Sequence, residues 1–205
     1  MILMKSLRLL LTAALSLVAM QSFAQAPMDA LRAMFSESAV SIDALYGMDV
    51  RQTSLSGDMQ ISVQGNMYHM KGNGLELYCN GETVWTIDEQ AREVVVESVS
   101  DLSELYMSNP VLVLADLDRY FKVMSHKSVK GLTEYELKSV ADCGIVDAIL
   151  VLSPDGMMVS GEFALEDGNV LSVKVRTMKK TEEMPLDSFS PKNKFSSDWV
   201  VTDLR

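Results

Sequence analysis

The fold of this chain is decided by residues 55–97, which read LSGDMQISVQGNMYHMKGNGLELYCNGETVWTIDEQAREVVVE. From Leu55 to Val63 apolar and polar residues alternate, as they do in a strand with one buried and one wetted face. Turn signals then recur at short intervals, and Asn80-Gly81 is the strongest because a two-residue hairpin turn needs positive φ, which Asn and Gly tolerate. The stretch therefore predicts an antiparallel meander, with further strands at 67–71, 75–79, 83–87 and 93–97.

A helix is predicted on the N-terminal side of this meander. Apolar or small residues recur there at steps of three and four, which places them on one helix face: Met28, Leu31, Phe35, Ser38, Ile42 and Leu45. Pro27 suits the first turn, and Gly47 suits the stop. The spacing predicts one helix of about five turns.

The C-terminal half returns mostly to strand patterns. A second helical region is predicted at 100–104 and from Ser108-Asn109-Pro110 onward, although the valines after Pro110 leave a strand open there. Further extended segments are predicted at 119–124, 134–140, 145–152, 157–165, 170–178 and 199–204. We find no linker and no internal repeat. The whole pattern predicts a mainly β (α+β) single domain of about ten strands with two or three helices.

The first 24 residues have the layout of a secretory signal peptide. Lys5 and Arg8 form a basic start, an apolar run follows, and Ser22-Phe23-Ala24 places small residues before a cut at Gln25. The apolar run is too short to span a bilayer, although an uncleaved anchor is the alternative. We expect residues 1–24 to be a cleaved signal peptide and residues 25–205 to form a periplasmic domain.

The charge of the chain opposes nucleic-acid binding. Lys and Arg total 18 against 28 Asp and Glu, for a formal charge of −10 over 205 residues. Removal of Lys5 and Arg8 with the signal peptide takes it to −12. A nucleic-acid partner needs cations that replace phosphate counterions, so we expect no nucleic acid among the partners.

The two cysteines allow two interpretations. In an oxidising compartment Cys79 and Cys143 could form a disulfide, or Cys79 could be a small buried residue and Cys143 a free thiol. Two cysteines with no nearby histidine do not form a metal ligand set, so no metal site is expected.

Catalytic motifs are not evident in the sequence. His69 and His126 are the only histidines and lie far apart, so each is interpreted as an ordinary surface or core residue. Glu182-Glu183 reads as a solvated charge run, and a spatially assembled pair of carboxylates stays possible. We expect no enzyme and name no catalytic residue.

Methionine is abundant, with 15 in the chain. An unbranched, polarizable side chain fills irregular space in a core and also accepts varied apolar guests. Core filling is the simpler interpretation of any one methionine. Their placement beside other apolar residues on predicted inward faces leaves a hydrophobic cavity as a hypothesis.

Several segments together resemble a known family. These are the N-terminal helix, Leu55-Ser56-Gly57-Asp58-Met59, the hairpin LYCNGETVW at 77–85, Glu93-Val94-Val95-Val96, the Asn109-Pro110 helix, and Phe189 with WVVTDLR at 199–205. In this order they resemble LolA-like outer-membrane lipoprotein carriers over nearly the whole exported chain. The hairpin pattern Asn-Gly-x-Thr-x-Trp is the most distinctive of them.

The resemblance implies an open, incomplete antiparallel β-barrel closed by helices, which holds the acyl chains of a lipoprotein in a hydrophobic cavity. Family members receive cargo from an ATP-driven inner-membrane exporter and pass it to an outer-membrane acceptor. No cofactor is implied, and we expect a monomer. The arginine that latches the lid in the best-known carriers would fall at Val63 or Gln64, and neither is arginine.

We therefore predict a periplasmic carrier that shields acyl chains. The predicted cavity lining, taken from strand parity and helix face, is Leu31, Phe35, Ile42, Met59, Ile61, Val63, Tyr68, Met70, Leu77, Val173 and Val175. The first alternative is an interaction module of the same fold that senses lipid or lipoprotein. The second is an envelope hydrolase.

Overall fold

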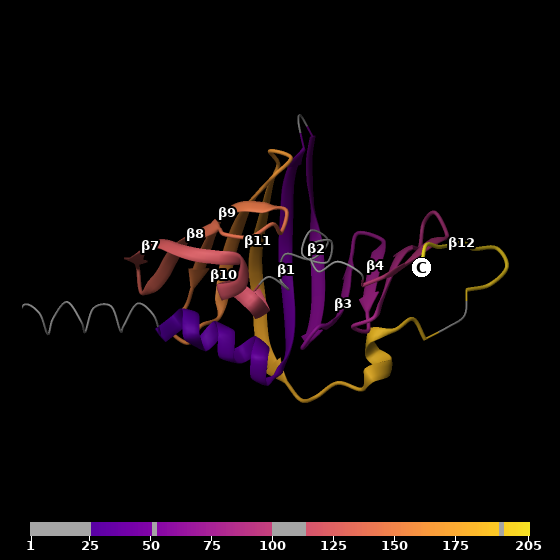
Figure 1. Ribbon diagram of the computed structural model, residues 1–205, viewed down its shortest axis with the longest axis horizontal. Coiled ribbons are helices and arrows are strands. Elements are labelled where there is room, and N and C mark those ends of the chain that lie inside the picture. Colours follow the sequence, from indigo (N-terminus) through magenta and orange to yellow (C-terminus); the bar gives the residue numbers. More distant parts are fainter. Residues whose placement is uncertain (1–25, 51–52, 100–113, 193–194) are drawn as a thin grey trace, which may run out of the picture.

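Twelve strands form one open sheet. The computed structural model describes residues 26–50, 53–99, 114–192 and 195–205. Over these residues the strand order is β12-β6-β5-β4-β3-β2-β1-β11-β10-β9-β8-β7 (Figure 1). Strands β7 and β12 stand at opposite ends of this order, so the sheet does not close into a barrel. Neighbours are antiparallel except β12 and β6, which run parallel. This parallel pair corrects the wholly antiparallel arrangement that the sequence predicts.

The elements have the following bounds. The strands are β1 Ala39–Val50, β2 Thr53–Gln64, β3 Met67–Gly72, β4 Leu75–Cys79, β5 Thr83–Asp88, β6 Glu93–Ser98, β7 Phe121–Val129, β8 Leu132–Ser139, β9 Ile145–Leu152, β10 Met158–Leu165, β11 Val170–Thr181 and β12 Val200–Asp203. An N-terminal helix covers residues 26–37. Short helical turns are η1 Leu114–Asp116, α4 Leu117–Tyr120 and η2 Leu186–Phe189.

The predicted five-turn helix is wrong in its second half. Helix ends at residue 37, and Ile42 and Leu45 lie on strand β1. Val40, Ile42, Ala44 and Tyr46 also alternate with exposed or half-buried neighbours, so this stretch fits both periods. Strand β1 pairs with β2 on one side and with β11 on the other. Ladder hydrogen bonds along both edges, together with burial, outweigh the local helical pattern.

The remaining elements lie close to the predicted positions. Strands β4 and β9 have the predicted bounds, and the others differ by a few residues at their ends. The twelve strands exceed the predicted ten mainly because β1 takes the place of helix. Among the described residues one helix is longer than four residues, whereas two or three were expected. The predicted second helical region at 100–113 and the predicted signal peptide lie outside the described residues.

Apolar side chains form two clusters on opposite faces of the sheet. The larger cluster includes Leu77 and Cys79 of β4 and side chains of the N-terminal helix. The side of the sheet on which it lies is called here the inner face. The smaller cluster holds Ile87, Val94 and Val96, with Tyr78 and Trp199 packed against it. Successive residues of a strand point to opposite sides, so Tyr78 faces away from Leu77 and Cys79. The side of the smaller cluster is called here the outer face.

The N-terminal helix runs below strands β8 to β11 in Figure 1 (indigo), and its apolar side chains belong to the larger cluster. The turn between β9 and β10 contacts it closely, because a Cβ on Gly156 would lie 2.6 Å from Cβ of Ala30 and 2.7 Å from the backbone nitrogen of Leu31. Arg32 on the helix binds Asp29 at 2.7 Å and Asp118 of α4 at 2.6 Å. The helix is therefore held against the sheet by apolar packing, and the Arg32–Asp118 pair joins it to α4.

Candidate functional site

Two rows of apolar side chains cross the inner face from β1 to β4. In the first row the paired residues are Ile42, Ile61, Met70 and Leu77, one from each successive strand. The second row pairs Val40, Val63, Tyr68 and Cys79 in the same way. Directly paired side chains on one face are close enough to contact each other. The rows therefore form a continuous apolar surface across four strands.

All eleven residues of the predicted lining lie in the larger cluster. Leu31 and Phe35 come from the N-terminal helix, and the other nine come from strands β1, β2, β3, β4 and β11. Eight are buried, whereas Met59, Met70 and Val175 are half-buried. Alternation along the strands thus identified which side chains share a face, although Ile42 reaches that face from a strand rather than from the predicted helix.

Other inner-face residues were missed by the sequence analysis. Val40, Ala44 and Tyr46 belong to the larger cluster through β1, and Met178 pairs with Ile42 from β11. The three β1 residues were missed because residues 39–46 were interpreted with a helical period, and Met178 was missed because a β-bulge opposite Asp43 and Ala44 breaks the alternation along β11. The alternation of Val40, Ile42, Ala44 and Tyr46 was the signal that could have found them.

Methionine contributes strongly to the inner face. Four methionines of the larger cluster are buried, and four are partly buried. They are Met28, Met34, Met158 and Met178 in the first group and Met48, Met59, Met70 and Met157 in the second. Flexible thioether side chains adapt to guests of different shape. The inner face therefore has the composition of an adaptable apolar surface.

Gln64 is one of the two positions at which the resemblance places the lid arginine of the best-known carriers. Its side-chain amide oxygen accepts a hydrogen bond from the backbone N–H of Met184 at 2.7 Å, and its amide nitrogen donates to the Met184 carbonyl at 3.4 Å. Met184 belongs to the segment that leaves β11. Both bonds of Gln64 therefore tie this end of β2 to the segment that follows β11.

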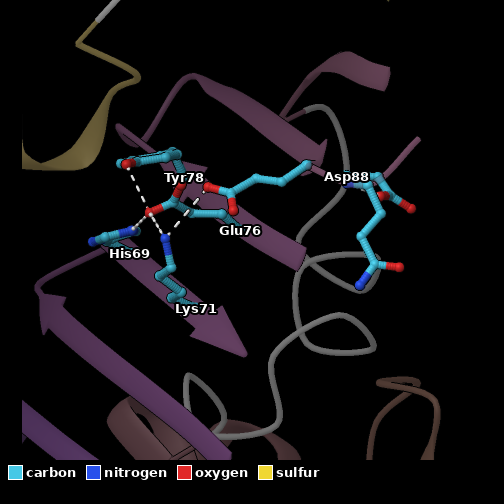
Figure 2. A network of polar contacts seen from close by, with 7 residues as sticks. His69, Lys71, Glu76, Tyr78 and Asp88 are labelled. Carbon is cyan, nitrogen blue, oxygen red and sulfur yellow. Dashed lines mark hydrogen bonds and ion pairs between the residues drawn. The ribbon is translucent and has the colours of Figure 1, made fainter. Parts of the chain in front are cut away.

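The outer face carries polar networks. At the centre of the sheet Arg176 of β11 binds Asp43 at 3.1 Å and also binds Asp58. Farther along, Glu76 accepts hydrogen bonds through Oε1 from Nε2 of His69 at 2.8 Å and from the Tyr78 hydroxyl at 3.0 Å (Figure 2). Glu76 is 15% exposed. Burial and the neighbouring Glu76 carboxylate raise the pKa of Tyr78 to about 12.

The remaining residues that the sequence singled out are dispersed. His126 lies on β7, with its ring 6.2 Å from that of Tyr135. Cys79 and Cys143 are both buried free thiols, so the disulfide alternative is not formed. Burial raises the pKa of the Cys79 thiol. Among the described residues no group of three or more His, Cys, Asp or Glu could hold a metal ion, and no helix is long and apolar enough to cross a membrane.

Comparison with known proteins finds similarity at the level of structure. No family model and no curated protein sequence matches the chain. An uncharacterized conserved protein from Thermus thermophilus is similar with a TM-score of 0.55 and 12% identity, over 88% of this chain and 98% of that one. A LolA superfamily protein from Nitrosomonas europaea has a TM-score of 0.47 and 12% identity, over 82% and 98%. A putative outer membrane lipoprotein-sorting protein domain from Vibrio parahaemolyticus has a TM-score of 0.43 and 12% identity, over 79% and 94%.

Proteins described as LolA superfamily and as lipoprotein-sorting are thus among the structures similar to this chain. At 12% identity these likenesses concern the fold alone.

Proposed function

We propose that this protein is a periplasmic carrier that shields the acyl chains of a lipoprotein on its inner face during transfer from the inner to the outer membrane. Residues 1–24 act as the cleaved signal peptide, and residues 25–205 form the lipid-binding domain. The partners are the acyl chains, an inner-membrane exporter and an outer-membrane acceptor. The carrier works as a monomer and uses no cofactor.

One observation carries the proposal, namely the methionine-rich apolar surface on one side of an open sheet. The rows from β1 to β4 carry this apolar surface across four strands, and all of their residues except Met70 are buried. Met59 and Met70 are partly exposed on it. A largely apolar surface with few polar groups suits the uptake of a hydrocarbon chain rather than bond-breaking chemistry.

The energetics of transfer are compatible with such a surface. An acyl chain that buries about twelve methylene groups gains roughly 10 kcal/mol relative to water, at about 0.8 kcal/mol per group. A bilayer offers a similar gain, so exchange between a membrane and the carrier is nearly neutral. The protein therefore needs an adaptable apolar surface more than a specific polar site.

The N-terminal helix is the element that would move to admit cargo. Arg32 joins the helix to Asp118 of α4, whose carboxylate is more than half exposed, whereas its pair with Asp29 lies within the helix. An exposed pair of this kind contributes about 0–1 kcal/mol. The pair with Asp118 can therefore guide the helix back to its place without preventing its displacement.

A binding experiment tests the proposal. The exported chain, residues 25–205, would be purified and studied by native mass spectrometry with lipid extraction, then titrated with a fluorescent fatty acid. We expect a bound acylated species and saturable probe uptake. Met59→Gln and Met70→Gln should weaken probe binding about fivefold or more, because each places a polar amide against the chain. Gln60→Glu, on the other face of β2, is the matched control and should bind as the unaltered chain does.

A transfer experiment separates the carrier from its alternatives. The protein would be mixed with inner-membrane vesicles that contain a labelled lipoprotein. A carrier brings the label into the soluble fraction, whereas a sensor binds without moving it, and a hydrolase releases cleaved product. Failure to bind any acylated species or fatty-acid probe would contradict the proposal.

A further inference from the structure

A hollow lies on the outer face, away from the apolar rows. Its volume is about 600 Å³, and it is formed by β4, β5, the turn after β5 and the C-terminal segment before β12. Tyr78, Phe195 and Trp199 supply aromatic rings to its wall, Glu76 and Glu89 supply carboxylates, and Ile87 supplies an apolar surface. A volume of this size is typical of small-molecule sites.

This hollow is separate from the proposed acyl-chain surface. Tyr78 and Glu76 alternate along β4 with Leu77, which belongs to the inner face. Alternate residues of a strand lie on opposite sides of the sheet. Ligands at the two places would therefore be divided by the thickness of the sheet.

The Glu76 carboxylate is held in position within the wall. His69 and Tyr78 donate to the same oxygen, Oε1, and the His69 ring is stacked on Tyr78 with centroids 4.2 Å apart and planes 8° from parallel. Lys71 lies 3.8 Å from this oxygen and 3.4 Å from Oε1 of Glu89 (Figure 2). Lys71 therefore links the two carboxylates, and the hydrogen bond and the stacking contact hold the Tyr78 ring in one orientation.

The opposite wall is aromatic. The Phe195 and Trp199 rings lie 5.3 Å apart and are tilted by 44°, and both pack against the smaller cluster. Glu76 and Glu89 line the same hollow, with Lys192 in its wall, and Lys71 lies beside both carboxylates. An organic cation is attracted to the faces of aromatic rings and to carboxylates, and it tolerates apolar neighbours better than a metal ion does.

We propose that the outer-face hollow binds a small organic ammonium group, with the rings of Tyr78, Phe195 and Trp199 around the cation and the carboxylates of Glu76 and Glu89 balancing its charge. This inference goes beyond the acyl-chain carrier function and does not depend on it. The chemistry is that of a primary or quaternary amine, whether free in solution or in a lipid headgroup.

Tryptophan fluorescence tests the proposal directly. The chain has two tryptophans, so Trp85→Phe leaves Trp199 in the wall as the only one. Residues 25–205 with this substitution would be titrated with choline and with 3,3-dimethylbutan-1-ol, its neutral isostere. We expect saturable quenching by choline and at least about tenfold weaker binding of the alcohol, since only the cation gains from the rings and carboxylates. Equal responses to both compounds, or no saturable response to choline, would overturn the proposal.

Two variants give the matched comparison. Glu89→Gln removes one charge at a half-exposed position and should weaken choline binding about threefold to tenfold. Glu162→Gln removes the same charge from an exposed position on β10 and should leave choline binding unchanged. Equal weakening by both variants would indicate a general charge effect and would contradict a local site. Circular dichroism confirms that both variants fold.

Vesicles distinguish the source of the ammonium group. Co-sedimentation with phosphatidylcholine vesicles that excess choline reverses would assign the hollow to a lipid headgroup, whereas choline binding without co-sedimentation would assign it to a free metabolite. Fatty-acid uptake on the inner face is measured separately. A protein that takes up the fatty acid but does not bind choline would overturn the ammonium-binding inference and leave the proposed carrier function intact.

Discussion

One glycine, Gly156, allows the N-terminal helix to approach the turn between β9 and β10 closely. Gly156 has φ of +81° and faces Ala30, Leu31 and Pro27, whereas Gly168 has φ of +83° and nothing within 4 Å of its Cβ position. A side chain at either residue is strained by the backbone, since L residues rarely adopt positive φ. At Gly156 an added side chain would also clash with backbone atoms of the helix, which cannot move aside as a flexible side chain can.

We expect the two alanine variants to differ in stability. Gly168→Ala should lower the free energy of unfolding by about 1 kcal/mol through backbone strain. Gly156→Ala should cost about 1–3 kcal/mol more, because the added methyl displaces the helix. Urea denaturation measures both. Equal losses in the two variants would show that the helix does not depend on this contact.

Tyr78 should make stability fall at alkaline pH. Its pKa is raised from 10.0 to about 12, so between these values the folded protein keeps a proton that the unfolded chain releases. The unfolded state then binds fewer protons, and the free energy of unfolding decreases as pH rises. Tyr78→Phe should reduce the slope between pH 10 and 12. An unchanged slope in urea titrations at these pH values would contradict this assignment.

At the scale of elements, the C-terminal segment protects one end of the sheet. Strand β12 pairs with β6 through four residue pairs, and Phe195 and Trp199 cover the smaller cluster. An unpaired strand edge beside exposed apolar residues is prone to association with other chains. The segment therefore contributes both stability and solubility.

Deletion of residues 195–205 should expose this end. We expect a loss of about 2–3 kcal/mol in the free energy of unfolding, because Phe195 and Trp199 are partly buried and the β12 pairs are lost with them. Light scattering should show increased self-association, because the β6 edge becomes free. Removal of Arg205 alone leaves the β12 pairs in place and serves as the control. A deletion variant that stays monomeric and stable would show that β12 is dispensable.

At the scale of the whole molecule, the question is whether the two clusters unfold together. The larger cluster spans the sheet from β4 to β7, and the smaller one occupies the other face near β5 and β6. They share strand β4, since Leu77 belongs to one and Tyr78 to the other. A shared strand couples the two faces, so both are expected to unfold together in one cooperative step.

We expect one cooperative transition in urea. Trp85 and Trp199 both report the smaller cluster, whereas far-ultraviolet circular dichroism reports the entire sheet. The two unfolding curves should coincide, and Gly156→Ala should shift both equally although it acts at the helix. A fluorescence transition at lower urea concentration would identify the β5–β6 end as a separate unit.

The sequence alone determined the strands and their faces, since the alternation from Leu55 to Val63 and the Asn80-Gly81 turn are local signals. Parity therefore placed eight sheet residues of the predicted lining on one face, whereas the ninth, Ile42, was predicted from a helical period. Residues 39–46 satisfied both a helical and a strand period, and only pairing with β2 and β11 decided between them. The parallel pairing of β12 with β6 and the outer-face hollow join residues that are far apart in the chain. No local pattern encodes such contacts, because they form only when the whole sheet assembles.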